Sequence, residues 1–383
     1  MSHCNKHMIS FFLTTKCNLC CRYCYNAQER NTIKEQTLPL DIAYAGIDWY
    51  FTNNKSRHIR FYGPGEPTQE FPKMKKITEY AKNHSNRGDE VTVEIQTNGV
   101  FTNEVREWIL QNVNIMWLSF DGMKDIQEYN RPINPKYSNL FSGKTSAEVL
   151  EDNAKWLIKN TSNHKLIVGA RVTITDKNID KQTEMVDYFS SLGIKYIWTN
   201  PIFYSVDKIP VCDDKTKKNK YSFDMDSYVD NYLKAYYYAK EKDVFWGSFL
   251  TINFDGESPY HCRCCTPLDA PHLTPDGYVS ACDMVVLGSA PYHMNLFIIG
   301  KWNSSTRTFE FDEEKIKNLN NRKSTNMKHC KTCVAKLNCG GCCLGETVNE
   351  TGRLDGQNYI KCNAIRRLFK ELGECEPYQY LHP

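Results

Sequence analysis

The sequence lacks long apolar runs, a strong excess of charge of either sign, internal repeats and low-complexity tracts. No apolar run approaches the ~18 residues that a membrane-spanning helix needs. The short apolar piece at residues 8–13 has no small-residue cleavage site after it. We therefore expect a cytoplasmic protein with no membrane partner. The net charge of +3 does not indicate a strongly polyanionic partner, and nothing in the sequence predicts binding to nucleic acid.

Cysteine is missing from the long stretch between Cys24 and Cys212, although the chain has seventeen cysteines. Most of them lie in two groups, one near the start and one in the last third of the chain. An odd number of cysteines cannot all pair in disulfides, and the chain is large and has no export signal. Clustered thiols in a reducing compartment more often hold metal, so the two groups predict metal sites.

Strand-like apolar runs alternate with amphipathic, helix-like stretches from residue 7 to about residue 200. The runs that predict strands are residues 7–13, 57–63, 91–99, 115–122, 166–175 and 194–200. The stretches that predict helices are residues 40–51, 72–84, 103–112, 146–160, 180–193 and about 223–242. The first six strands and the helices between them indicate an α/β fold with a parallel sheet and right-handed crossovers.

Unusual residues follow four of the predicted strands. The first cysteine group follows the first strand, GPGEP (63–67) the second and TNG (97–99) the third, while SFDG (119–122) ends the fourth. Parallel α/β sheets carry their chemistry in the loops after the carboxyl ends of their strands. The four loops are therefore predicted to converge on one end of the sheet.

The composition and periodicity of the sequence change after about residue 200. The remainder is rich in cysteine, glycine and short elements with little periodicity, which suits a small domain organised by metal rather than by a large apolar core. At 383 residues the chain is long enough for two domains. We place the α/β domain at residues 1–235 and a small α+β domain at residues 236–383.

The first cysteine group offers three thiolates from one short loop. Cys17, Cys21 and Cys24 have the spacing Cys-x3-Cys-x2-Cys. A four-iron cluster normally takes four cysteines, one per iron, so three protein ligands leave one iron open to an exogenous ligand. On these residues alone, a zinc site or a closed cluster completed by a distant cysteine is the alternative.

This loop resembles the CxxxCx(aromatic)C loop of the radical SAM superfamily, with Tyr23 at the aromatic position. The resemblance covers roughly residues 7–200 and implies a partial (β/α)6 TIM-like barrel. It also implies a [4Fe-4S] cluster that binds S-adenosylmethionine (SAM), and an external electron donor such as a flavodoxin or a ferredoxin. In this superfamily, cleavage of SAM gives a 5′-deoxyadenosyl radical that abstracts a hydrogen atom from the substrate.

The resemblance implies a set of SAM-binding residues in the predicted loops. The loop at residues 63–67 matches the family's GGEP motif, which contacts the methionine ammonium of SAM, except that Pro64 replaces the first glycine. Ser119 matches a serine that contacts the ribose or the methionine, and Arg131 matches the cation for the methionine carboxylate. The full implied set is Tyr23, Gly65, Glu66, Pro67, Ser119 and Arg131.

The cysteines of the last third resemble the SPASM domain that follows many radical SAM barrels. Their spacing is Cys265-x11-Gly277-x4-Cys282, then Cys330-x2-Cys333-x5-Cys339-x3-Cys343, then Cys362. The resemblance implies two auxiliary [4Fe-4S] clusters, which makes three clusters in the chain. The implied ligands are Cys262, Cys265, Cys282 and Cys343 for the first, with Cys264 as an alternative to Cys262 or Cys265, and Cys330, Cys333, Cys339 and Cys362 for the second.

Some cysteines are left without a metal role. Adjacent cysteines rarely both reach one metal, so Cys20, Cys342 and one of the pair Cys264 and Cys265 are expected to be spare. Without the family resemblance, the Cys-x2-Cys pair at residues 330–333 also fits a zinc ribbon.

Asp283 directly follows Cys282 and matches the aspartate that accepts a proton in anaerobic sulfatase-maturating enzymes, which share this architecture. Beside a cluster, it could take a proton while a substrate radical is oxidised. The alternative is a structural aspartate that caps a turn. We predict Asp283 as the catalytic residue.

The resemblance implies an oxidoreductase that modifies a peptide or protein. The first hypothesis is a maturase of a ribosomally made peptide, in which hydrogen abstraction leads to a cross-link or an oxidation. Only six residues precede the first predicted strand, so we expect leader recognition to use a separate protein or the SPASM surface, or to be absent. Two alternatives are a sulfatase-maturating enzyme that makes formylglycine from Cys or Ser, and a non-catalytic iron–sulfur or zinc protein that carries electrons.

The Cys-x3-Cys-x2-Cys spacing generates a first prediction, because it excludes Cys20 from the ligand set. Cys20→Ala should keep the iron content and SAM cleavage of the wild type, whereas Cys21→Ala should abolish SAM cleavage. Anaerobic reconstitution with iron and sulfide, followed by an assay for 5′-deoxyadenosine, measures both. Loss of cleavage in Cys20→Ala would mean that the cluster is closed by four cysteines.

Overall fold

The computed structural model describes residues 7–26, 34–85, 90–203, 223–290 and 292–373. Cys4, Cys212 and Cys375 lie outside these described residues. None of the described helices is both long enough and apolar enough to cross a membrane.

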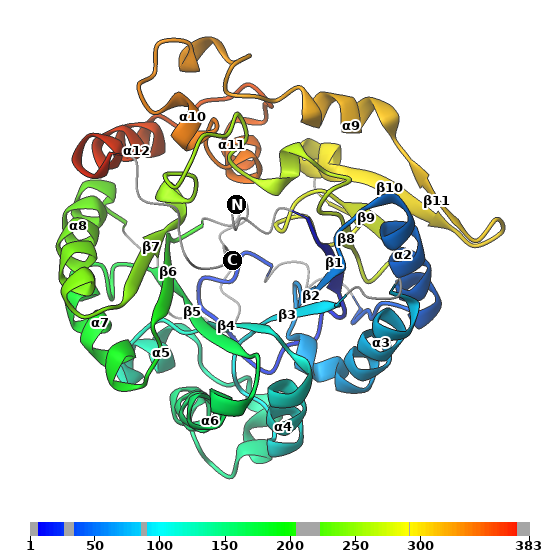
Figure 1. The fold of residues 1–383 in the computed structure, drawn as a ribbon, viewed down its shortest axis with the longest axis horizontal. Coiled ribbons are helices and arrows are strands. Elements are labelled where there is room, and N and C mark those ends of the chain that lie inside the picture. The colour runs from blue at the N-terminus through cyan, green and yellow to red at the C-terminus, as the bar shows by residue number, and fades with distance from the viewer. Residues whose placement is uncertain (1–6, 27–33, 86–89, 204–222, 291, 374–383) are drawn as a thin grey trace.

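One continuous sheet of eleven strands runs through the described residues in the order β11-β10-β9-β8-β1-β2-β3-β4-β5-β6-β7. Its first seven strands pair in parallel and curve into a partial barrel (Figure 1). The strands are β1 (Ile9–Phe12), β2 (His58–Tyr62), β3 (Thr92–Thr97), β4 (Ile115–Ser119), β5 (Ile167–Ile174), β6 (Tyr196–Pro201), β7 (Phe245–Ser248), β8 (His272–Leu273), β9 (Tyr278–Ser280), β10 (Ile298–Asn303) and β11 (Thr308–Phe311).

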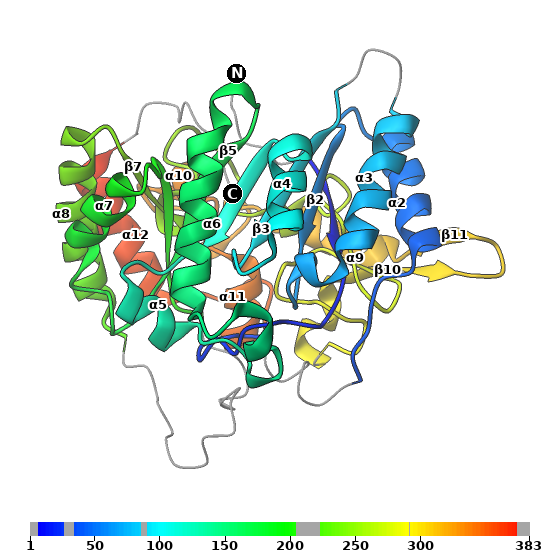
Figure 2. The same cartoon turned by 90° about the horizontal axis from the view of Figure 1, so that it is seen from below.

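The helices cover the outside of the barrel, as Figure 2 shows for α3, α4 and α6 beside the strands. Their amphipathic faces bury apolar side chains against the sheet, which is why the sequence pattern predicts them. The helices are α2 (Leu40–Asn53), α3 (Phe71–His84), α4 (Asn103–Asn112), α5 (Lys124–Asn130), α6 (Ser146–Asn160), α7 (Gln182–Ser191), α8 (Met225–Glu241), α9 (Glu313–Asn320), α10 (Lys336–Cys339), α11 (Leu344–Thr351) and α12 (Tyr359–Leu372).

The prediction of a partial barrel of six βα units is confirmed for β1 to β6 and the helices between them. Helix α5 and strand β7 were not predicted from the sequence. Strand β7 is four residues long and contains Gly247, so its pattern is too short to be recognised. It extends the parallel sheet by pairing with β6, for example Ile197 with Trp246.

The cysteine-rich region joins the barrel through a strand pair that the sequence did not predict. Strand β8 pairs in parallel with β1, with Ser10 opposite His272. In an open barrel the outer edge of β1 has no neighbouring barrel strand, and β8 supplies hydrogen-bonding partners for the backbone groups of that edge. The packing there is close, because a Cβ placed on Gly46 of α2 would lie 2.3 Å from Leu273 Cδ1.

Strands β8 to β11 continue the sheet as antiparallel neighbours. On the other side, α12 packs beside α8, and Arg367 of α12 forms ion pairs with Asp226 and Asp230 of α8. Helices α10, α11 and α12 therefore lie between the β7 side and the β8 side of the open barrel (Figure 1). The predicted α+β region thus lies across the opening of the barrel.

Candidate active site

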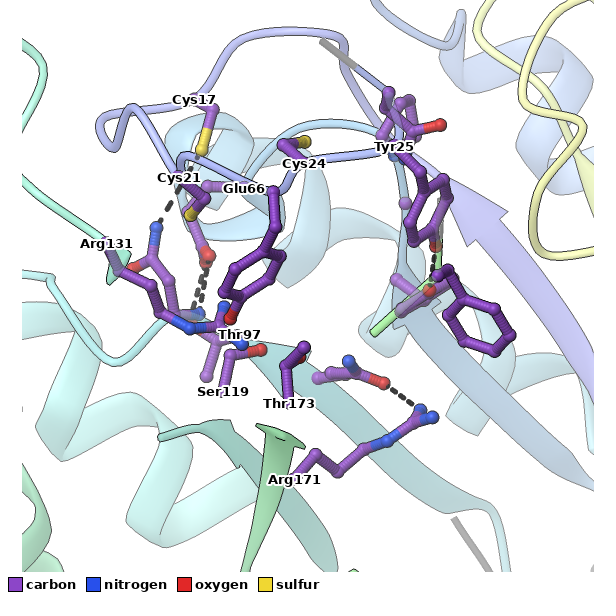
Figure 3. Close-up of a pocket in the computed structure, with 18 of the residues that line it drawn as sticks. Cys17, Cys21, Cys24, Tyr25, Glu66, Thr97, Ser119, Arg131, Arg171 and Thr173 are labelled. Atoms are coloured by element: carbon purple, nitrogen blue, oxygen red, sulfur yellow. Dashed lines mark hydrogen bonds between the residues drawn. The ribbon is translucent and has the colours of Figure 1, made fainter. Parts of the chain in front are cut away.

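Three cysteines of the first loop line a cavity at the carboxyl ends of the barrel strands. Cys17, Cys21 and Cys24 lie on one side of this cavity, in the loop that follows β1 (Figure 3). The N–H of Cys24 donates to the carbonyl oxygen of Cys21 at 3.2 Å, which folds the loop into a turn. The loop therefore presents three thiols to one cavity.

Cys20 does not line this cavity. Its side chain is buried, and its N–H donates to the carbonyl oxygen of Pro132 at 2.8 Å. The neighbouring Leu19 pairs with Ile133 in an isolated β-bridge. These contacts fix the backbone at Leu19 and Cys20 against the segment after α5, while the other three cysteines line the cavity.

Glu66 extends a buried carboxylate to the wall of the same cavity. Its Oε1 accepts hydrogen bonds from the Thr68 N–H at 3.1 Å, the Thr68 hydroxyl at 2.8 Å and the Thr97 hydroxyl at 2.7 Å. Its Oε2 accepts one from the Asn98 N–H at 2.8 Å. Burial raises the pKa of the Glu66 carboxyl, although these hydrogen bonds oppose the shift. Oε2 retains acceptor capacity for a cation in the cavity.

Gly65 lets the turn after β2 approach the cysteine loop. Its N–H donates to the Thr14 carbonyl at 3.1 Å, and the Glu66 N–H donates to the Lys16 carbonyl at 2.7 Å. A Cβ on Gly65 would lie 2.1 Å from the Lys16 oxygen and 2.6 Å from the Thr14 oxygen. Because these atoms are backbone, only glycine fits. Pro64 leaves both hydrogen bonds intact, since neither donor belongs to it.

Arg131 is held by a carboxylate that the sequence analysis missed. Its Nε and Nη2 donate to the two oxygens of Asp121 at 3.0 and 3.1 Å, and the Tyr23 hydroxyl donates to Asp121 Oδ2 at 2.5 Å. The Arg131 guanidinium also lies 5.1 Å from the centre of the Tyr23 ring. Burial alone would lower the pKa of Arg131, but the ion pair with Asp121 raises it. Arg131 therefore stays charged with one edge of its guanidinium fixed.

Asp121 itself is fully buried and does not line the cavity. It accepts two further hydrogen bonds, from Asn130 Nδ2 at 3.1 Å and from the Thr173 N–H at 3.0 Å. The signal in the sequence was the SFDG segment, of which the prediction used only Ser119. Ser119 does line the cavity, whereas Pro67 starts the 3-10 helix Pro67–Glu70 and does not.

A second cavity lies between the barrel and the cysteine-rich region. Its wall includes five C-terminal cysteines and Asp283. The two cavities share part of their walls, so they are neighbours, and each is lined by one of the two cysteine regions. The shared residues are Tyr25, Tyr62, Arg171, Asn200, Phe203 and Phe249.

The thiols predicted for the first auxiliary cluster lie together. Contacts with Cys262 and Cys282, followed by burial, raise the pKa of Cys264. A contact with Cys262 lowers the pKa of Cys265, and Cys343 and Cys282 act on it electrostatically in the opposite direction. The structure thus gathers five thiols where the predicted ligand set needs four, and it does not separate Cys264 from Cys265.

The second predicted set also lies together. Burial, together with Cys362 and Cys333, raises the pKa of Cys330. Burial raises the pKa of Cys339 to about 12, and Cys362 and Cys330 contribute in the same direction. Cys342 lies between the two sets, since its N–H donates to Cys339 Sγ at 3.2 Å and its thiol interacts with Cys343.

Within the described residues, no three His, Cys, Asp or Glu side chains converge closely enough to hold a single metal ion. A zinc ion would need its sulfur ligands ~2.3 Å away. A four-iron cluster, in contrast, contacts each thiol at a different iron.

Asp283 faces the second cavity with 38% of its side chain exposed. Its Oδ1 accepts from Arg60 Nη2 at 2.6 Å and lies 3.4 Å from His272 Nε2. Burial alone would raise the pKa of Asp283, but Arg60 and then His272 hold it well below its usual range. The predicted catalytic residue is therefore a positioned, ionised carboxylate on the cavity wall.

Comparison with known proteins identifies the fold family. Residues 11–189 match the family model of the radical SAM superfamily. Over these residues, just under half of its length, the chain is similar to the radical SAM superfamily. A serine-type anaerobic sulfatase-maturating enzyme of Bacteroides thetaiotaomicron is 23% identical over 93% of this chain and 87% of its own length. An uncharacterized protein of Methanocaldococcus jannaschii is 30% identical over 195 residues, which are 50% of this chain and 61% of that protein.

Solved structures show the same fold over the barrel and the cysteine-rich region. Native anSMEcpe with bound AdoMet and Cp18Cys peptide superposes with a TM-score of 0.68, at 18% identity, over 95% of this chain and 96% of that one. Streptococcus suis SuiB bound to the precursor peptide SuiA gives a TM-score of 0.61, at 14% identity, over 92% of this chain and 75% of that one.

The residues around the first cavity fit SAM. The methionine end of SAM carries an ammonium and a carboxylate group. Glu66 offers an anionic acceptor, Arg131 a cation and Ser119 a hydroxyl on the wall that also holds the three cysteines. Charge-assisted hydrogen bonds of this kind are the stronger ones in proteins. These three residues would therefore hold the methionine end beside the cluster.

The close approach of Gly65 generates a second prediction. Gly65→Ala should push the turn after β2 away from the cysteine loop, because the new Cβ would meet the Lys16 oxygen at 2.1 Å. We expect SAM affinity to fall by at least about tenfold, since the displaced Glu66 loses a charge-assisted contact. Equilibrium dialysis of the reconstituted protein against labelled SAM measures it.

Gly256→Ala is the matched control, because a Cβ at Gly256 meets no atom within 4 Å. It should bind SAM like the wild type. Wild-type affinity in Gly65→Ala would contradict the coupling between the two loops.

Proposed function

We propose that the protein is a radical SAM enzyme that modifies a peptide or protein, with a cross-link or an oxidation as the outcome. The observation that carries this proposal is that the SAM-binding cavity adjoins the cavity beside the C-terminal thiols, with part of their walls in common. A substrate that contacts this common wall would lie between SAM and the C-terminal thiols. Both solved relatives described above were determined with bound peptides, which supports a peptide as the occupant.

When bound, the cluster and SAM supply a 5′-deoxyadenosyl radical for hydrogen abstraction, with an electron from an external donor such as a flavodoxin or ferredoxin. The chain's own residues bind SAM and orient it. Glu66, Ser119 and Arg131 hold the methionine end of SAM, and Asp121 fixes Arg131. An electron carrier would not need these groups, which argues against the non-catalytic hypothesis.

Asp283 is proposed as the residue that accepts a proton from the substrate. The support for this role is its position: the carboxylate lies on the wall of the second cavity beside Cys282, and Arg60 fixes one of its oxygens. The other oxygen, Oδ2, has no hydrogen bond among the described residues that would block its approach to a substrate. General-base assistance of this kind contributes ~100-fold or more to a rate.

A second candidate function is the oxidation of a Cys or Ser side chain to formylglycine. It is favoured by the sulfatase-maturating relative, whose match runs along 93% of this chain, and by the position of Asp283. Both candidates use the same cavities and differ in the substrate. Neighbouring open reading frames offer a first discrimination, since a short precursor favours the first candidate and a sulfatase the second.

We further propose that the grouped C-terminal cysteines hold two auxiliary [4Fe-4S] clusters. Their ligands would be Cys282 and Cys343 with Cys262 and Cys265, and the set Cys330, Cys333, Cys339 and Cys362. The support is that each set is gathered in the structure.

The auxiliary clusters generate a prediction about metal content. The anaerobically reconstituted wild type should contain about twelve iron atoms per chain, and a Cys330→Ala, Cys333→Ala double variant about eight, because one four-iron cluster is lost. Inductively coupled plasma mass spectrometry measures iron and zinc together. About four iron atoms with stoichiometric zinc would contradict the auxiliary clusters.

The function is tested with Asp283→Asn, which keeps the shape of the side chain. In an anaerobic assay with SAM, a reductant and peptides encoded near the gene, the wild type should form 5′-deoxyadenosine and a peptide of altered mass. The variant should yield roughly 100-fold less modified peptide per 5′-deoxyadenosine. Asp152→Asn, at an exposed ion pair with Lys144, is the control and should match the wild type. An unchanged ratio in Asp283→Asn would remove its proposed role.

A further inference from the structure

Arg171 lies where the two cavities meet. It is a residue of β5, opposite Ser119 of β4 in the sheet, and its side chain is partly buried. Figure 3 shows its guanidinium far across the cavity from Cys17 and Arg131. The cation therefore belongs to the wall that the two cavities share, away from the residues proposed to hold the methionine end of SAM.

Arg171 has neutral partners. One guanidinium nitrogen, Nη1, donates to the side-chain oxygen of Gln96, and the group lies 4.5 Å from the centre of the Phe249 ring. No ion pair joins Arg171 to a carboxylate in the described part of the chain. A guanidinium has five N–H donors, so most of its donors remain available.

Nearby acidic groups already have cations of their own. Asp121 pairs with Arg131, Glu346 with Lys361, and Asp283 with Arg60. Burial lowers the pKa of Arg171, although Tyr62 and Asp283 act electrostatically in the opposite direction. Keeping a partly buried cation without a carboxylate is costly unless a ligand supplies one.

We propose that Arg171 binds a carboxylate of the peptide substrate, as a specificity-determining residue. The inference rests on the proposed function. It narrows the peptide substrates to those that present an acidic group near the reacting residue. The carboxylate belongs to an Asp or Glu side chain or to the peptide C-terminus. Arg171 would form charge-assisted hydrogen bonds with it, and Gln96 and Phe249 would hold the guanidinium in place.

Retention of synthetic peptides on immobilised, reconstituted protein in the presence of SAM tests the proposal without requiring turnover. Four pools of random peptides serve as probes. Three have blocked termini and contain acidic, amide or basic residues at the varied positions, and the fourth is the amide pool with a free C-terminal carboxylate. Mass spectrometry identifies the retained peptides and, separately, any that are modified.

The wild type should retain the acidic pool or the pool with free C-termini in preference to the blocked amide pool, and the retained pool identifies the source of the carboxylate. Arg171→Gln should weaken that retention by about 10- to 100-fold, the loss expected for a hydrogen bond to a charged group. Arg171→Lys should restore part of it. Arg307→Gln, at an exposed position in the turn between β10 and β11, is the matched control and should retain peptides like the wild type.

Preference for the blocked amide or basic pool, or equal retention by the wild type and Arg171→Gln, would overturn the proposal. A loss of SAM affinity in Arg171→Gln as large as the loss of peptide retention would also overturn it, because it would assign Arg171 to the SAM carboxylate. Selective retention of acidic peptides without any modified product would contradict the proposed function and leave the carboxylate site standing.

Discussion

The backbone contact between Gly65 and the segment Thr14–Lys16 is the constraint on which the site depends. It joins the loop after β1, which carries the three cysteines, to the turn after β2, which carries Glu66. Two backbone hydrogen bonds fix the distance between the loops, and the missing side chain of Gly65 permits it. The thiols and the buried carboxylate are therefore held in one rigid unit, as preorganised binding of a zwitterionic cofactor requires.

Charge neutralisation organises the rest of the two cavities. Asp121 anchors Arg131 from behind the wall, Arg60 anchors Asp283, and Lys361 pairs with Glu346 beside the C-terminal thiols. Each of these groups can then keep its charge in a partly buried place. Arg171 has no such ion pair in the described part of the chain. Its position at the junction of the cavities is therefore suited to binding a carboxylate of the substrate.

Sequence periodicity predicted the six βα units because each is long enough to show a repeating apolar pattern. It also placed Glu66, Ser119 and the three cysteines together, since loops at the carboxyl ends of parallel strands must meet. The pairing of β8 with β1 could not be predicted from the sequence, because β8 has only two residues and therefore no periodic apolar pattern. Asp121 was missed because its role depends on Arg131 and Tyr23, which only the folded chain brings to it.

The central claim is that the three-cysteine loop leaves one iron open and that Glu66 and Arg131 direct the methionine end of SAM to it. Electron–nuclear double resonance on the reduced wild-type protein, with isotope labels in the amino and carboxylate groups of SAM, tests this most directly. We expect hyperfine coupling of both labels to the cluster. Bound SAM without such coupling would contradict it.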